Sequence, residues 1–123
     1  MTKKVLVIED DNILQRAMDI ALSDAGFEVS QAFDGETGLS KAKTEKPDVI
    51  LLDLMLPKIP GEQVLKEMNE SGLIEKIPVV VFSVKGDEAS IKNCLDIWGA
   101  KDFLTKSSYT VEEVVDKIRK VIK

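Results

Sequence analysis

Two hydrophobic patterns alternate along the chain: short runs of mostly β-branched residues, and longer segments in which apolar residues recur every three or four positions. The short runs predict five β-strands, at residues 5–8, 28–33, 49–52, 79–83 and 102–105. The longer segments predict five α-helices, at residues 14–25, 35–46, 61–71, 87–98 and 110–122. Such alternation is typical of a parallel sheet that carries helices on both faces and has right-handed crossover connections.

Small and polar residues mark several of the predicted helix ends. Gly26 follows the first periodic segment and suits a helix terminator, and Asp87 suits the N-cap of the fourth helix. Thr110 and Glu113 form a capping-box pair at the start of the last helix. Gly38 lies inside the second predicted helix, where it should reduce the stability of that helix.

The strands differ in how apolar they are, and this difference predicts their order. Residues 5–8, 49–52 and 79–82 are continuously apolar, as strands buried on both faces require, whereas the runs at 28–33 and 102–105 are weaker or shorter. The two weak strands belong at the edges, which gives the order 2-1-3-4-5. This is the flavodoxin-like doubly wound α/β fold, whose binding crevice lies at the carboxyl ends of strands one and three.

Composition and charge exclude several function classes. With 123 residues, of which 44% are apolar and 32% charged, the chain is expected to form one globular domain, residues 1–123. Its net charge is −5 and it has no basic run interleaved with aromatics, which disfavours direct binding to nucleic acid or to an anionic membrane. No apolar run approaches the roughly 20 residues of a membrane span, and we expect a cytoplasmic location.

Asp53 is a lone carboxylate in one of the most apolar segments of the chain, VILLDLMLP at residues 49–57. Burial of an unpaired carboxylate is costly, so other groups must converge on it. Glu9 and Asp10 follow the first predicted strand, Ser83 ends the fourth, and Lys106 follows the fifth. In the predicted strand order all of these positions fall at the same edge of the sheet, which indicates one shared site.

The residue types at this edge indicate a particular chemistry. Three neighbouring carboxylates need a cation between them, and Mg²⁺ prefers oxygen ligands with room for water. Lys106 and Ser83 are not needed to hold a cation, but they suit an anion. Together these groups favour phosphoryl transfer to Asp53 as the nucleophile. Taken singly, each has a structural explanation: residues 9–11 as helix caps, Ser83 as a strand end, and Lys106 as a solvated side chain.

These segments resemble the receiver domains of two-component response regulators (CheY-like domains), and the resemblance extends over essentially the whole chain. VLVIEDD is similar to the family's first strand with its acidic pair, and PDVILLDLMLP to its phosphoacceptor strand. VVVFS is similar to the strand that ends in the switch hydroxyl, and GAKDFLTK to the segment that carries the lysine. The resemblance implies that Asp53 is the phosphoacceptor and that Ser83 and Lys106 assist the transfer.

The resemblance also implies ligands and partners. Mg²⁺ would be bound by Asp10, Asp53 and the backbone carbonyl of Met55, with Glu9 acting largely through water. The phosphoryl group would come from the phosphohistidine of a sensor histidine kinase or of a phosphotransfer protein. The signal would pass to a downstream protein partner or an output domain. Such a chain catalyses its own phosphoryl transfer and dephosphorylation and is otherwise a signalling domain rather than an enzyme.

Phe103 is the implied switch aromatic, which is expected to turn from an exposed to a buried position when phosphorylation draws Ser83 toward the phosphate. Two positions depart from the family pattern. Ser107 follows the lysine, where the family usually has proline, often after a cis bond. Val84 replaces the small residue that usually follows the switch hydroxyl, and its branched side chain is expected to crowd the approach to Asp53.

Two other classes share this fold but fit the site residues less well. A flavodoxin-type flavin carrier needs a phosphate loop rich in hydroxyls and glycine after strand one, where this chain has Glu9, Asp10 and Asp11, which would repel the phosphate. A pseudo-receiver, which keeps the fold only to bind partners, is disfavoured by the complete set of acids, hydroxyl and lysine, while Ser107 and Val84 keep it open. The sequence is compatible both with a stand-alone receiver and with an output domain outside this chain.

Overall fold

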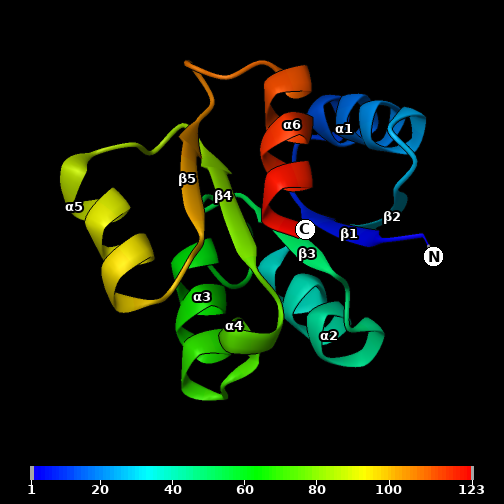
Figure 1. The fold of residues 1–123 in the computed structure, drawn as a ribbon. Helices are drawn as coiled ribbons and strands as arrows, with labels where there is room; N and C mark the ends of the chain where they lie inside the picture. The colour runs from blue at the N-terminus through cyan, green and yellow to red at the C-terminus, as the bar shows by residue number, and fades with distance from the viewer. Residues whose placement is uncertain (1, 123) are drawn as a thin grey trace.

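The computed structural model describes residues 2–122. Its centre is a parallel sheet formed by β1 (Lys4–Ile8), β2 (Glu28–Ala32), β3 (Val49–Leu52), β4 (Val79–Ser83) and β5 (Asp102–Thr105) (Figure 1). The strand order is β2-β1-β3-β4-β5. This order confirms the flavodoxin-like topology predicted from the apolar content of the strands.

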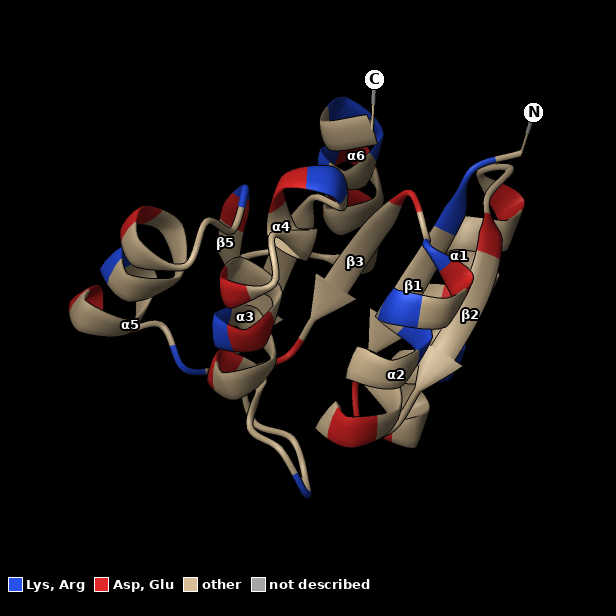
Figure 2. Cartoon of the chain, turned by 90° about the horizontal axis from the view of Figure 1, so that it is seen from below, with Lys and Arg blue, Asp and Glu red and all other residues tan. Residues whose placement is uncertain are grey.

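Helices cover both faces of the sheet. On one face lie α1 (Asn12–Asp24) and α6 (Val111–Ile122), side by side in Figure 1. On the other face lie α2 (Gly35–Glu45), α3 (Gly61–Glu70), the one-turn α4 (Leu73–Lys76), α5 (Glu88–Lys92) and its π-helical continuation η1 (Asn93–Ile97). Charged residues lie mainly on the helices and loops, whereas β3 carries none (Figure 2).

Successive side chains of each strand enter two separate cores, because they point to opposite faces of the sheet. On β1, Leu6 and Ile8 belong to the core under α2, α3 and α4, whereas Val5 and Val7 belong to the core under α1 and α6. Every residue of β3 and β4 is buried. Burial on both faces explains why the central strands show no alternation of apolar and polar residues.

The predicted helix ends are confirmed by local contacts. The Asp87 carboxylate accepts a hydrogen bond from a backbone N–H in the first turn of α5 (3.1 Å). Thr110 and Glu113 form the reciprocal bonds of a capping box, of 2.8 and 3.2 Å. Gly26, just beyond α1, has a φ of +94°, a conformation that favours glycine. The presence of glycine at position 38, inside α2, is explained by close packing. A Cβ at this position would lie 2.7 Å from Ile8 Cδ1.

All five predicted helices are present, with two differences. The helix predicted at 61–71 is followed by α4, a separate turn that starts after Gly72, whose φ is +80°. The helix predicted at 87–98 widens after Lys92 into η1, in which the N–H of Trp98 donates to the carbonyl of Asn93 (3.0 Å), five residues earlier. Within residues 2–122, no helix has the length and hydropathy of a membrane-spanning segment.

Candidate functional site

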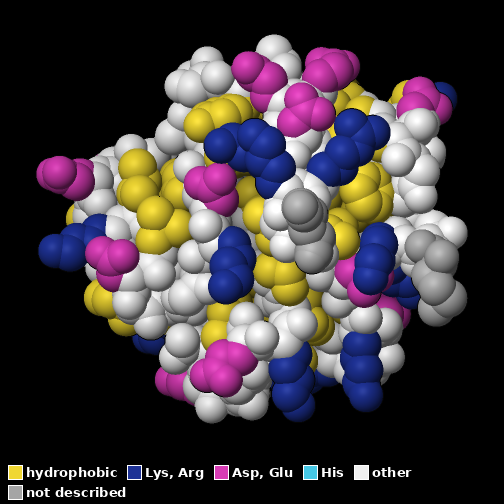
Figure 3. Space-filling model, in the orientation of Figure 1, with side chains coloured by type: hydrophobic (Ala, Val, Ile, Leu, Met, Phe, Trp, Pro, Cys, Tyr) yellow, Lys and Arg dark blue, Asp and Glu magenta, His cyan; other side chains and the backbone are white. Residues whose placement is uncertain are grey.

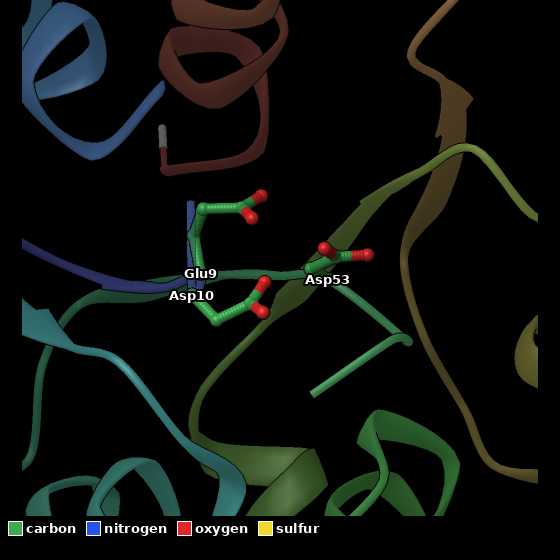
Figure 4. Close-up of side chains that lie close together, drawn as sticks. All are labelled: Glu9, Asp10 and Asp53. Carbon is green, nitrogen blue, oxygen red and sulfur yellow. The ribbon is translucent and has the colours of Figure 1, made fainter. Parts of the chain in front are cut away.

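Asp53 meets the acidic pair Glu9 and Asp10 at the carboxyl edge of the sheet. The N–H of Asp53 donates to the carbonyl of Ile8 (3.0 Å), which extends the pairing of β1 and β3 beyond Leu52 and aligns the two acidic segments. One carboxylate oxygen from each of the three acids lies within 4.8 Å of the others. Figure 4 shows Glu9 and Asp10 extending from the end of β1 toward the Asp53 side of the site. Glu9 and Asp53 are buried, whereas Asp10 is exposed.

Lys106 brings a positive charge into this acidic site. Its Nζ donates to Glu9 Oε1 (2.8 Å) and to Asp53 Oδ2 (3.1 Å). The backbone N–H of Lys106 donates to the carbonyl of Ser83 (2.9 Å), which fixes the lysine beside β4. Nζ also lies 5.9 Å from the centre of the Phe82 ring, within the range of a cation–π contact. The lysine therefore partly neutralises two of the three carboxylates.

Burial and neighbouring charges shift the pKa values of Glu9 and Lys106. It raises the pKa of Glu9 from its ordinary 4.5 to about 7; the hydrogen bond from Lys106 opposes this shift, and the negative charge of Asp53 adds to it. Burial alone would lower the pKa of Lys106, but the hydrogen bond to Glu9 and the charge of Asp53 outweigh it and raise that pKa. In the metal-free site, three carboxyl groups thus share one lysine.

The raised pKa of Glu9 predicts how the stability of the metal-free protein depends on pH. The folded protein holds the Glu9 proton more tightly than the unfolded chain does. This group therefore stabilises the fold fully below about pH 4.5, and the stabilisation is lost as the pH rises through about 7. With a chelator present, Tm should fall between about pH 5 and 7.5, and Glu9→Gln should show a smaller fall. Parallel curves for the two proteins would contradict the raised pKa.

The loop after β3 holds Asp53 from the other side. The N–H of Gly61 donates to the carbonyl of Leu54 (2.9 Å). A Cβ on Gly61 would lie 2.3 Å from the carbonyl oxygen of Asp53, so only glycine fits without moving the loop. The N–H of Met55 donates to Asp53 Oδ1 (3.2 Å), which leaves Oδ2 for Lys106. Backbone and side chain of Asp53 are therefore both fixed before any ligand binds.

Ser83 is buried at the end of β4, next to Lys106. Its Oγ accepts a hydrogen bond from the N–H of Lys85 (3.3 Å), and within the described residues no hydrogen bond joins it to Asp53. Val84 is 66% exposed and lines a groove that Ile13 and Lys106 also line. The predicted crowding of Asp53 by Val84 stays a prediction.

Comparison with known proteins identifies the family. The model of the family described as the response regulator receiver domain matches residues 5–119. The chain belongs to this family. It is 35% identical over 123 residues to the alkaline phosphatase synthesis transcriptional regulatory protein PhoP of Bacillus subtilis (strain 168), covering 100% of this chain and 50% of that protein. It is 38% identical over 116 residues to the transcriptional regulatory protein DltR of Streptococcus agalactiae serotype III (strain NEM316), covering 94% and 50%.

Solved structures of receiver domains have the same fold. The receiver domain of a putative Luxo repressor protein from Vibrio parahaemolyticus superposes with a TM-score of 0.91 at 24% identity, covering 99% of this chain and 91% of that one. The Francisella response regulator 1452 receiver domain gives a TM-score of 0.89 at 27% identity, covering 98% and 97%. The chain spans about half the length of the curated relatives it matches.

Phe103 does not have the exposed position predicted for an unphosphorylated receiver domain. It is 8% exposed and packs in the same core as Cys94 and Ala100, under η1. The predicted exposed starting position is therefore wrong for this structure, because burial of the ring removes a large apolar area from water. The peptide bond between Lys106 and Ser107 is trans.

Two features of this receiver domain were not predicted from the sequence. Lys85 Nζ binds Glu62 Oε2 (2.8 Å), which ties the loop after β4 to the start of α3. Gln15 is buried beside the acidic pair and donates to the backbone carbonyl of Glu9 (3.1 Å). The signal for Gln15 in the sequence is a polar residue on the otherwise apolar inner face of the first helix. No local sequence pattern reveals the ion pair of Lys85 and Glu62, which are 23 residues apart.

The oxygen donors at the site fit a hard divalent cation. Three carboxylates converge, and within the described residues Asp10 has no ion-pair partner of its own. Because Asp10 is exposed, its side of the site is open to water, and Mg²⁺ usually keeps several waters while it binds one or two carboxylates. The arrangement therefore suits Mg²⁺ better than a cation that requires a closed cage.

Proposed function

We propose that this receiver domain accepts a phosphoryl group on Asp53 in a magnesium-dependent reaction and changes conformation in response. The observation that carries the proposal is the direct contact of Lys106 Nζ with Asp53 Oδ2 (3.1 Å) at a buried edge where three carboxylates converge. The donor is the phosphohistidine of a sensor histidine kinase or a phosphotransfer protein. An Asp53 oxygen forms the new bond to phosphorus while the bond to the histidine nitrogen breaks, and the nitrogen keeps the electron pair.

The acids and the lysine have separate roles in this proposal. Asp10, Asp53 and the backbone carbonyl of Met55 would hold Mg²⁺, with Glu9 acting largely through water. When bound, Mg²⁺ neutralises charge on the transferring phosphoryl oxygens. Lys106 would add a second positive charge, since its Nζ already lies at Asp53. The same groups would assist the later dephosphorylation, in which water attacks phosphorus, the bond from phosphorus to the Asp53 oxygen breaks, and the carboxylate leaves with inorganic phosphate as the other product.

A route from the site to the rest of the domain runs through the loop after β4. A phosphoryl group offers charged hydrogen bonds to Ser83 Oγ and Lys106 Nζ, worth roughly 1.5–3 kcal/mol each, which is enough to shift a population. This loop rests on β5, since a Cβ on Gly86 would lie 2.4 Å from Thr105 Cγ2. Because Phe103 is already buried, we expect loop movement to reach β5 through Thr105 rather than through inward rotation of that ring.

Beryllofluoride, which mimics an acyl phosphate on aspartate, tests both the site and the switch. Amide chemical shifts of the Mg²⁺ form should change on its addition, from Asp53 through Val84 and Asp87 to β5 and Trp98. The Asp53→Asn protein should show no such changes. Changes confined to residues that touch the mimic would reject the switch and leave a phosphoryl carrier. A spectrum that does not respond at all would reject the site.

Other proteins, rather than nucleic acid, are the proposed direct partners of this domain. Its net charge is −5, and acidic and basic side chains are interspersed over the face shown in Figure 3. PhoP and DltR are transcriptional regulatory proteins about twice as long as the matched region. We therefore propose that the signal passes to an output domain or to a separate protein, in the cytoplasm, where the kinase presents its phosphohistidine.

A further inference from the structure

Gln15 is a polar residue on the buried face of α1. Its side chain is 1% exposed and lies on the same face as Met18 and Leu22, which are fully buried. Its Nε2, which carries two hydrogens, lies within hydrogen-bond distance of three backbone carbonyls, those of Val7 (2.9 Å), Glu9 (3.1 Å) and Ala32 (2.9 Å), so one hydrogen is shared between two of them. One amide group therefore joins α1 to the ends of β1 and β2, immediately before the acidic pair.

The amide of Gln15 replaces a backbone hydrogen bond that would be the next one between β1 and β2. The last backbone bond between β1 and β2 runs from the N–H of Glu9 to the carbonyl of Ala32 (3.0 Å). Because β2 ends at Ala32, no backbone N–H of the described residues reaches the carbonyl of Glu9, which would be the next acceptor. Gln15 supplies that donor. Gln15 therefore holds the backbone carbonyl of Glu9 just after β1 ends, next to the bend at Asp10.

The N–H groups of the Gln15 side-chain amide make its hydrogen bonds to the strand ends, whereas its oxygen makes none. Its oxygen, Oε1, is buried and has no hydrogen-bond partner within the described residues. The opposite orientation would point this oxygen at three carbonyl oxygens, which also only accept. A buried acceptor without a partner is costly. An apolar side chain would avoid that cost, so packing alone does not account for glutamine at this position.

We propose that Gln15 is a positioning residue for the metal site, which it serves by holding the backbone of Glu9 and thereby aiming the carboxylates of Glu9 and Asp10. This inference rests on the proposed magnesium-dependent function. Gln15 touches no carboxylate oxygen and acts only through the backbone. Groups that orient metal ligands typically change metal affinity by roughly 10- to 100-fold when they are removed.

The test compares Mg²⁺ binding by the 123-residue chain carrying Gln15→Met with that of the unsubstituted chain. Methionine has a similar length and no N–H donor, so the Mg²⁺ dissociation constant should rise by roughly ten-fold. Leu22→Val is the matched control, because it disturbs the same buried face of α1 two turns from the site. It should lower Tm and leave the dissociation constant unchanged. Gln15→Arg, which restores N–H donors, should recover part of the affinity.

A second measurement needs no metal. Hydrogen exchange of the Glu9 amide should be faster in Gln15→Met than in Leu22→Val, after each is referred to its own global stability. If Gln15→Met does not fold, Gln15→Asn, whose side chain is one carbon shorter, replaces it. Its Mg²⁺ affinity and Glu9 amide exchange are then compared with those of Leu22→Val. Wild-type Mg²⁺ affinity in the variant, or unchanged Glu9 exchange, would overturn the positioning role alone. Wild-type protein that binds no Mg²⁺ would overturn the proposed function and this inference with it.

Discussion

Asp53→Asn is expected to reduce phosphorylation by small acyl phosphates below detection. An amide is not a nucleophile, and its oxygen is a weaker ligand for a divalent cation than a carboxylate. The fold should persist, because asparagine has the same shape and can still accept from the N–H of Met55, which now bonds Asp53 Oδ1 (3.2 Å). Lys106 keeps its contact with Glu9 (2.8 Å). The substitution therefore removes the nucleophilic carboxylate and leaves the surrounding structure in place.

The matched control for this variant is Asp24→Asn. Asp24 is exposed at the end of α1, so the control removes the same charge outside the site. Intact mass after incubation with acyl phosphate and Mg²⁺ should show one phosphoryl addition for wild type and for Asp24→Asn, and none for Asp53→Asn. Wild-type labelling of Asp53→Asn would remove this residue from the role of acceptor.

Asp10→Ala is expected to weaken Mg²⁺ binding by about ten-fold or more, because a charged ligand is lost. The same change should raise the Tm of the metal-free protein by a few degrees. Asp10 lies within 4.8 Å of Glu9 and Asp53, and Lys106 contacts only the latter two. Removal of the unpaired carboxylate relieves repulsion worth about 1 kcal/mol for a partly exposed charge.

Asp11→Asn separates a ligand role from a general effect of charge. Asp11 is the next residue in the chain, and its Oδ1 caps α1 by accepting from the N–H of Ile13 (2.9 Å). Asparagine keeps this capping bond and removes the charge. Calorimetric titration should therefore give near wild-type Mg²⁺ affinity for Asp11→Asn and a large loss for Asp10→Ala. Equal affinities in the two variants would exclude Asp10 from the metal site.

The fold and the location of the site were accessible from sequence because both depend on simple patterns. Continuous apolar residues at 49–52 indicate a central strand, since only a strand covered on both faces tolerates them. The strand order then places Asp53, Glu9 and Lys106 at one edge, and the observed contacts of Lys106 with both acids agree with that placement.

Features that depend on exact packing were not accessible. The widening of α5 into η1 leaves the apolar period nearly unchanged, so the pattern predicts one continuous helix. The buried state of Phe103 depends on the space left under η1, which no local pattern encodes. Gln15 acts on carbonyls 6, 8 and 17 positions away in sequence. Such contacts become visible only when the strand ends are placed in three dimensions.

The most direct test of phosphoryl acceptance is the intact mass of wild-type protein incubated with a small acyl phosphate, with and without Mg²⁺. One phosphoryl addition is expected with Mg²⁺, carried on the peptide that contains Asp53 and removed by hydroxylamine, as an acyl phosphate requires. Addition should be absent when a chelator replaces the metal. No addition in the presence of Mg²⁺, or equal addition without it, would contradict magnesium-dependent phosphorylation of Asp53.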